Sequence, residues 1–306
     1  MVRRSPKIPF PVKRHPDIDE IESHTLAWAA RFGLVSSEEA KQRLAASRFG
    51  EYAAFTYPDA PWPEAGIAGD WLTWAFLIDD QYEDRNLVTE EDWREIVAAT
   101  GDVLSGRPPR FEAPLIAALA DLTGRLYTLS SPAWRKRFTE HFTAMITGAS
   151  REIRLRDTGV PPTKAEYVEL RRDVGAMRVV FDTMEICVRT ELGDESYRYP
   201  AYQEIVTAGA DIVTWTNDLH SVTKEVEAGM VTNMVLVLSH HENLTLAEAA
   251  DATVDLIEGR VSDLRAAMSL LHDDRTLRCA RAVCDWVAGS DHWHLSRTER
   301  YGASGR

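Results

Sequence analysis

The segment WLTWAFLIDDQYEDR, residues 71–85, joins an apolar run to a cluster of acids. The cluster contains four carboxylates, Asp79, Asp80, Glu83 and Asp84. On a helix, residues four apart share a face, so positions 79 and 83 would be neighbours, and so would positions 80 and 84. Like charges at this spacing repel, and the negative end of the helix dipole strengthens the repulsion at a helix C-terminus. A cation close to these acids would relieve the repulsion.

The close spacing of hard carboxylate oxygens suits Mg²⁺, which takes one or two carboxylates from a protein and completes its shell with water and substrate phosphates. Arg85 could neutralise part of the cluster instead. A solvated acidic helix end is the alternative interpretation, and this segment alone leaves both open.

A second polar segment, TNDLHSVTKE at residues 216–225, places Asn217, Ser221 and Glu225 on one face of a predicted helix. Their backbone positions span roughly 12 Å. Glu225 has the longest side chain, and helical side chains lean toward the N-terminus, so its carboxylate can approach the other two. The apolar residues upstream imply a buried helix, in which unpaired polar groups are costly. The segment favours three oxygens around one cation over the alternative, a polar stripe facing solvent.

Amphipathic segments of helical period fill the rest of the chain, and an alternating strand pattern is almost absent. We expect helices over residues 17–33, 37–48, 66–84, 88–105, 112–129, 131–157, 163–191, 197–227, 231–240, 245–272 and 276–289. Capping boxes are expected at Ser36 and Glu39, Thr163 and Glu166, and Thr245 and Glu248. The predicted fold class is all-α.

A 306-residue chain with 44% hydrophobic residues can bury one large core or two ordinary ones. The stretches rich in Pro and Gly at 58–66, 106–109 and 159–162 are short, as connections between packed helices are. We therefore predict a single helical domain over residues 17–306, preceded by a flexible, basic and proline-rich lead over residues 1–16.

The formal net charge of −13, from 35 basic and 48 acidic residues, argues against a general affinity for nucleic acid. The three cysteines form no CxxC arrangement, so neither a disulfide framework nor a thiolate zinc site is indicated. No run of about 18 uncharged apolar residues occurs, and the N-terminal segment lacks the apolar core of a secretory signal. We expect a cytoplasmic protein without a membrane span.

With these two polar segments the chain resembles the bacterial class I terpene synthases, also called terpene cyclases. Residues 79–84 are similar to the family's aspartate-rich motif DDxx(x)(D/E), and residues 217–225 to its NDxxSxx(K/R)E motif. By spacing from the second motif, the family's diphosphate-sensing arginine corresponds to Arg171 rather than to Arg172. Gly175 fits the small effector residue of the family, and an Arg-Tyr pair near the C-terminus corresponds to Arg300 and Tyr301.

The resemblance implies a helical bundle around a central active-site cavity and a reaction that depends on Mg²⁺, with three ions held by the two motifs. The metal ligands would be Asp79, Asp80, Glu83, Asp84, Asn217, Ser221 and Glu225, and whether Glu83 or Asp84 is the outer ligand stays open. Arg171, Lys224, Arg300 and Tyr301 would donate hydrogen bonds to the diphosphate. Val174 stands where the family has a polar linker residue, so either the family's signal relay is not conserved in this chain or Asp173 takes part in it.

The implied reaction is ionisation and cyclisation of an allylic prenyl diphosphate, with farnesyl diphosphate giving a cyclic sesquiterpene. A diterpene cyclase acting on geranylgeranyl diphosphate is the alternative, and a chain-elongating prenyltransferase or a non-catalytic helical module fits the motifs less well. Homodimerisation is plausible by the same resemblance. Aromatic rings should line a cavity that holds a carbocation. By helical position the candidates are Phe55, Trp74, Phe76, Phe181, Trp215 and Trp293.

Overall fold

The structure, a computed structural model, describes residues 4–83, 90–298 and 300, of which residues 81–83 and 90 are described by their backbone alone. Over these ranges the chain forms helices and no strand, which confirms the all-α prediction. The helices are α1 (Ile18–Arg31), α2 (Glu38–Ser47), α3 (Phe49–Thr56), α4 (Glu64–Glu83), α5 (Glu90–Leu104), α6 (Pro114–Leu129), α7 (Pro132–Thr158), α8 (Lys164–Val174), α9 (Met177–Cys187), α10 (Asp194–Tyr197), α11 (Pro200–Ala228), α12 (Met234–Glu242), α13 (Leu246–Met268) and α14 (Asp274–Ser296).

Most helix ends lie within a few residues of the predicted ones, and side-chain caps begin several of the helices. Thr163 and Thr245 each begin a helix with a complete capping box, as expected. At α2 the prediction is wrong by one residue, because the cap is Ser37, whose side chain accepts a hydrogen bond from the amide of Ala40. The single helix expected over 163–191 is divided into α8 and α9, and α3 was not predicted at all.

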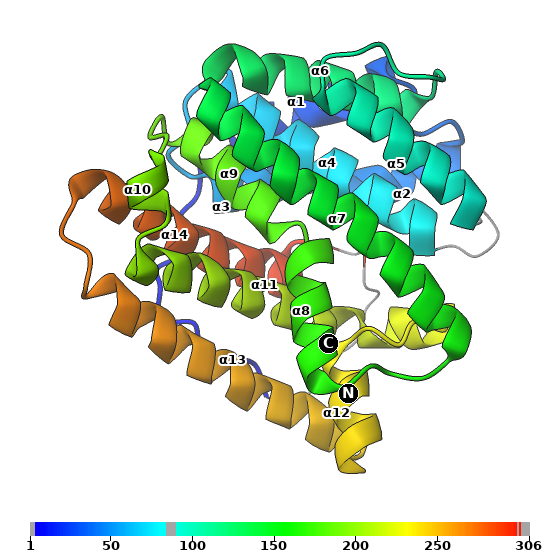
Figure 1. Cartoon of the computed structure of the whole chain (residues 1–306), viewed down its shortest axis with the longest axis vertical. Helices are drawn as coiled ribbons and strands as arrows, with labels where there is room; N and C mark the ends of the chain where they lie inside the picture. The colour runs from blue at the N-terminus through cyan, green and yellow to red at the C-terminus, as the bar shows by residue number, and fades with distance from the viewer. Residues whose placement is uncertain (1–3, 84–89, 299, 301–306) are drawn as a thin grey trace.

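The central helices α4 and α11 carry the two polar motifs, and each is buried among other helices. The apolar residues of α4 face several directions, so this helix packs against α1, α3, α6, α7 and α9. Helix α11 packs against α8, α9, α12, α13 and α14. Figure 1 shows α4 to α7 in the upper part of the molecule and α11, α13 and α14 in the lower part, with α8 and α9 between them. The motif helices therefore lie on opposite sides of the interior.

Residues 4–16 contain no helix but contact the helical domain at several points. Arg4 forms an ion pair with Asp255 at 2.8 Å, and Lys13 forms one with Asp285 at 2.9 Å. The imidazole Nε2 of the buried His15 lies 2.8 Å from the carbonyl oxygen of Ala60. The division into a flexible lead and one domain stays a prediction.

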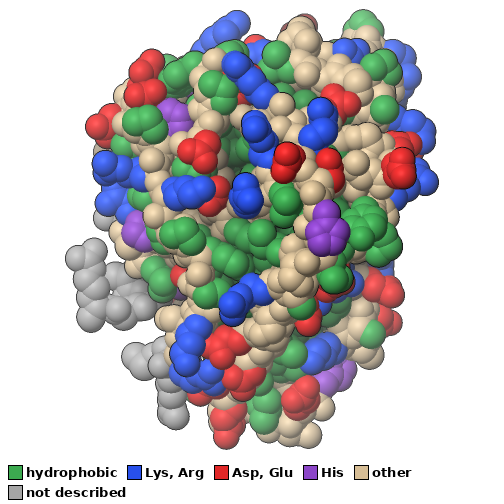
Figure 2. Space-filling view, turned by 90° about the vertical axis from the view of Figure 1, so that its left-hand side faces the viewer, with side chains coloured by type: hydrophobic (Ala, Val, Ile, Leu, Met, Phe, Trp, Pro, Cys, Tyr) green, Lys and Arg blue, Asp and Glu red, His purple; other side chains and the backbone are tan. Residues whose placement is uncertain are grey.

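The surface is charged and mixed. On the face drawn in Figure 2, basic and acidic side chains are interspersed, and hydrophobic side chains lie between them across the middle of the face. Within the ranges that the structure describes, none of the helices is both long and apolar enough to cross a membrane.

Candidate active site

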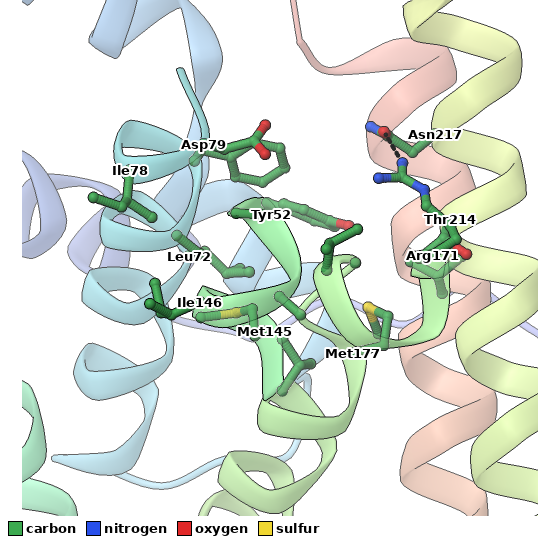
Figure 3. A pocket seen from close by; sticks show the side chains of 18 of the residues that line it. Tyr52, Leu72, Ile78, Asp79, Met145, Ile146, Arg171, Met177, Thr214 and Asn217 are labelled. Carbon is green, nitrogen blue, oxygen red and sulfur yellow. Dashed lines mark hydrogen bonds between the residues drawn. The ribbon is translucent and has the colours of Figure 1, made fainter. Parts of the chain in front are cut away.

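A cavity opens between the two motif helices. Its lining comes from α3, α4, α5, α7, α8, α9, α11 and α14, and from the break between α8 and α9. Figure 3 shows apolar side chains such as Leu72, Met145 and Met177 in its lower part, with Asp79 at the upper end on one side. Arg171 and Asn217 face Asp79 from the other side. With its open mouth included, the space between the lining residues measures about 850 Å³. The polar end and the apolar interior suit an amphiphilic substrate.

The second motif forms a compact group of oxygen atoms at the C-terminal end of α11. The Oγ atom of Ser221 lies 2.5 Å from Oε1 of Glu225, so the glutamate reaches back along the helix as expected. The other carboxylate oxygen, Oε2, accepts a hydrogen bond of 2.9 Å from Nδ2 of Asn233. Amide, hydroxyl and carboxylate oxygens of this kind are ligands that Mg²⁺ prefers, so the residues present fit the expected metal.

Asn233 is a residue of the candidate site that sequence reasoning missed. It is completely buried, and its side chain caps α12 through a 2.8 Å bond from the amide of Val235 to Oδ1. Its Nδ2 also donates to the backbone carbonyl of Asp218 at 2.9 Å. The asparagine follows Glu225 by eight residues, beyond the end of α11, so helical spacing could not have connected the two. It holds the glutamate in a fixed orientation.

Arg171 lies at the cavity beside the first residue of the second motif. Its Nη2 donates to Oδ1 of Asn217 at 3.0 Å and to Oδ1 of Asp218 at 2.8 Å. Burial opposes the positive charge, but the carboxylate of Asp218 outweighs this effect and raises the pKa of Arg171 well above its ordinary value. Asp218 is held in turn by the hydroxyl of Tyr167 and by the amide of Met234. A permanent cation is thus fixed at the cavity mouth.

The neighbouring arginine points elsewhere. Arg172 donates from Nε and Nη2 to the two carboxylate oxygens of Asp211, at 2.8 and 2.7 Å, and lines a different pocket, outside the cavity. Arg260 also lies 3.0 Å from Asp211. Of the two adjacent arginines, only Arg171 lines the cavity that Asp79 and Asn217 share.

Asp80 binds two basic residues, Arg300 and Lys224, that are distant from it in the chain. Arg300 donates to both carboxylate oxygens, at 2.8 and 2.7 Å, and Nζ of Lys224 lies 3.1 Å away. Burial raises the pKa of Asp80, but the two cations outweigh burial, so the net effect is a lowered pKa and a stable carboxylate. The guanidinium of Arg300 also lies 4.8 Å from the ring centre of Phe76.

Three other predicted site residues fall outside this description. The side chain of Glu83, the whole of Asp84 and the whole of Tyr301 lie beyond the described parts of the chain. The question whether Glu83 or Asp84 is the outer ligand therefore stays open.

Of the six aromatic residues predicted to line the cavity, the structure places only Phe76 there. Trp74 is fully buried on the opposite side of α4, where its Nε1 donates to the carbonyl of Leu115. Trp293 stacks on Tyr52 at 4.2 Å, and Phe181 meets Trp286 edge to face, so both support rings of the lining from behind. Phe55 packs on His292, and Trp215 is buried outside the lining. The lining aromatic residues that sequence reasoning missed are Tyr52, Trp93 and Trp286.

The break between α8 and α9, at Gly175 and Ala176, also lines the cavity. Gly175 has an ordinary φ of −66°, whereas Ala176 has a φ of +61°, in the left-handed region that side chains disfavour. A Cβ atom at position 175 would lie 2.5 Å from Cγ2 of Thr214 and 2.7 Å from the carbonyl oxygen of Arg171. The glycine is therefore required for close packing against α11.

His294 reaches the cavity from α14. Its Nε2 lies 3.3 Å from Nδ2 of Asn217, and its Nδ1 lies 2.8 Å from the carbonyl oxygen of Ser290. Burial and the adjacent His220 lower the pKa of His294 to about 3, so the ring is neutral.

Comparison with known proteins agrees with this geometry. The family model described as "Terpene synthase family 2, C-terminal metal binding" matches residues 70–263, which include both polar motifs. Pristinol synthase of Streptomyces pristinaespiralis is 30% identical over 270 residues, which cover 86% of this chain and 73% of that protein. A (+)-T-muurolol synthase of Roseiflexus castenholzii, named as cyclizing (2E,6E)-farnesyl diphosphate, is 29% identical over 300 residues, covering 95% and 91% of the two chains.

The crystal structure of linalool/nerolidol synthase from Streptomyces clavuligerus superposes with a TM-score of 0.84 at 25% identity, over 95% of this chain and all of that one. The family match covers residues 70–263, which is more than half of the chain, and the linalool/nerolidol synthase structure shares the fold over its full length. The chain therefore belongs to the terpene synthase family, as a bacterial class I terpene synthase.

Proposed function

We propose that the protein ionises farnesyl diphosphate with the help of Mg²⁺ and cyclises the resulting cation to a sesquiterpene. The observation that carries this proposal is the arrangement of the cavity, in which Asp79 faces Arg171 and Asn217 across the mouth of an apolar interior. This arrangement would hold the charged diphosphate at the mouth and the hydrocarbon chain below it. The cyclisation of farnesyl diphosphate named for the (+)-T-muurolol synthase supports the 15-carbon substrate.

The metal ligands in this proposal are the acids of α4 and the oxygens of α11. Asn217, Ser221 and Glu225 would hold one Mg²⁺, and Asp79 with its neighbouring acids would hold the others, three ions in all. The bound ions would neutralise the charge that develops on the diphosphate as the carbon–oxygen bond breaks.

The basic residues at the mouth would bind the leaving group directly. Arg171 is a permanent cation beside Asn217, and donors to phosphate oxygens are strongest when they are charged. Arg300 and Lys224 are held at the same end of α4 by Asp80. Preorganised donors of this kind stabilise charge where it develops and need little rearrangement during the reaction.

The interior would protect the carbocation and shape its cyclisation. Phe76, Trp93 and Trp286 line the cavity, and a ring face stabilises a desolvated cation by about 2 kcal/mol. The remaining lining is mostly aliphatic, which keeps water away from the cation. No lining side chain needs to form a covalent bond with the substrate in this proposal.

The proposal is tested by incubating the purified protein separately with geranyl, farnesyl and geranylgeranyl diphosphate, with and without Mg²⁺. Gas chromatography with mass detection of the organic extract should reveal a cyclic C15 product from farnesyl diphosphate only when Mg²⁺ is present. A cyclic C20 product would show that the substrate is geranylgeranyl diphosphate instead. Longer prenyl diphosphates as products, or no turnover of any substrate, would contradict the proposal. Homodimerisation stays a prediction that light scattering would test.

A further inference from the structure

An amide side chain can serve as a metal ligand only when its oxygen faces the metal. Asn217 begins the second motif, and its two amide ends have different neighbours, Arg171 on α8 and His294 on α14. A guanidinium has donors and no acceptor, so the end that faces Arg171 must be the oxygen. The NH₂ group therefore faces His294, at 3.3 Å.

The hydrogen bonds of His294 match this orientation. The NH₂ group of Asn217 donates, so Nε2 of His294 must present a lone pair. The ring proton must then sit on Nδ1, which lies 2.8 Å from the carbonyl oxygen of Ser290, a group that can only accept. Rotating the amide by half a turn would set the oxygen against a lone pair and the NH₂ group against the guanidinium. Two contacts therefore select one orientation.

Diphosphate binding in the proposed reaction would affect the two contacts of the Asn217 amide differently. Arg171 would turn toward the diphosphate, and its bond to Asn217 would then weaken. His294 is buried on α14, and its ring is fixed by Ser290 on the same helix and by stacking against His220. This contact would remain when the diphosphate binds.

We propose that His294 is a positioning residue that holds the amide of Asn217 with its oxygen toward the metal site. The inference rests on the proposed function, because it assumes a metal at the second motif. The loss of a group that orients a metal ligand in this way typically lowers metal affinity by about 10- to 100-fold.

The test measures metal binding without any prenyl substrate. The melting temperature of the purified chain is followed as Mg²⁺ is raised at a fixed concentration of inorganic diphosphate, which yields the half-saturating Mg²⁺ concentration. His294→Phe, which keeps a ring but has no acceptor, should raise that concentration about tenfold or more. His294→Gln, whose oxygen can replace Nε2 as the acceptor, should stay within about threefold of the unsubstituted chain. His292→Phe is the matched control on the same helix and should have no effect, since His292 packs against Phe55 instead.

A second background separates ligand orientation from structural damage. Asn217→Asp provides two equivalent oxygens, and its orientation no longer matters. Adding His294→Phe to this variant should change the half-saturating Mg²⁺ concentration by less than about threefold, because the contact that the histidine made is no longer needed. A tenfold loss in both backgrounds would overturn the inference and assign His294 a purely structural role.

The outcomes also separate this inference from the proposed function. Stabilisation by Mg²⁺ and diphosphate together with the expected loss in His294→Phe would support the inference even if no prenyl diphosphate were cyclised. Cyclisation with equal Mg²⁺ affinity in the unsubstituted chain and in His294→Phe would overturn the inference alone. Failure of the unsubstituted chain to respond to Mg²⁺ would overturn the metal site and the inference together.

Discussion

Arg300 binds Asp80 through two parallel hydrogen bonds, of 2.8 and 2.7 Å, although the residues are 220 positions apart in the chain. The pair joins Arg300, which follows α14 in the chain, to the acidic end of α4, next to the cavity mouth. Bidentate pairs between arginine and a carboxylate are among the stronger polar contacts in proteins. The position of Arg300 therefore depends on the charge of Asp80.

Replacing Asp80 should release Arg300. In Asp80→Asn the charge is lost, so trypsin should cleave after Arg300 about tenfold faster, a change that corresponds to losing a charge-assisted hydrogen bond. The cleavage rate is measured by intact mass. Asp102→Asn is the matched control, because Asp102 also pairs with two arginines, Arg107 and Arg110, but lies on α5. Equal cleavage rates in all three proteins would show that the Asp80 pair does not hold Arg300.

The first motif could be read from the sequence because its features are local. Apolar spacing and the position of the acids identified α4, and threonine caps identified the starts of α8 and α13. By contrast, α3 escaped prediction because all eight of its residues are buried, and it therefore has no polar face to reveal a helical period. Helix α3 begins after Arg48, which has a left-handed φ of +56°. No residue pattern in the sequence indicates this conformation.

The cavity lining was harder to predict than the motifs because it depends on helix rotation. Trp74 and Phe76 are two residues apart, so they project to nearly opposite sides of α4, and only Phe76 reaches the cavity. Asn217 and His294 are 77 residues apart and meet only because α11 packs against α14. Contacts of this kind follow from tertiary packing and leave no local signal in the chain.

Glu225 should be essential for turnover and dispensable for folding. In Glu225→Gln one ligand oxygen becomes an NH₂ group that cannot bind a metal, while the size of the side chain is kept. The value of kcat should fall at least about 100-fold, a loss of the size seen when a preorganised charge stabiliser is removed. Circular dichroism should show an unchanged helical spectrum. A variant that retains near-normal kcat with Mg²⁺ would remove Glu225 from the proposed ligand set.

The two adjacent arginines should have opposite phenotypes. Arg171→Ala removes the cation at the cavity mouth, and kcat/KM should fall about 100-fold. Arg172→Ala should leave kcat/KM within about threefold but lower the free energy of unfolding by about 2 kcal/mol, because it deprives the buried carboxylate of Asp211 of one of its two cations. Steady-state kinetics and urea unfolding measure the two effects. The reverse pattern would move the sensing role to Arg172.

The two residues at the break between α8 and α9 should respond differently to substitution. Gly175→Ala forces a methyl group against Thr214 and the carbonyl of Arg171, so we expect a loss of about 2 kcal/mol in stability together with lower activity. Ala176→Gly relieves a left-handed conformation that costs roughly 1 kcal/mol, and this gain offsets the greater freedom of glycine in the unfolded chain. Its stability in urea should be unchanged or higher. Equal destabilisation by both substitutions would contradict this account.

The carboxyl group of Asp291 on α14 should make the stability of the protein fall as pH rises. Burial raises the pKa of its carboxyl group to about 6, and its buried Oδ1 has no hydrogen-bond partner among the residues that the structure describes. Between the ordinary aspartate pKa of about 4 and this value, the folded state keeps a proton that the unfolded state has released. Stability contributed by this group must therefore fall as pH rises through that interval, and the loss persists above it.

Asp291→Asn removes the titration and should be more stable than the unsubstituted chain above pH 6, by on the order of 2 kcal/mol. The advantage should shrink toward zero as pH falls to about 4, where the carboxyl group is protonated in both states. Urea unfolding at several pH values between 4 and 8 measures the difference. A difference in unfolding free energy that does not change across this range would show that Asp291 is ionised in the folded protein, as it would be if water reached its carboxylate.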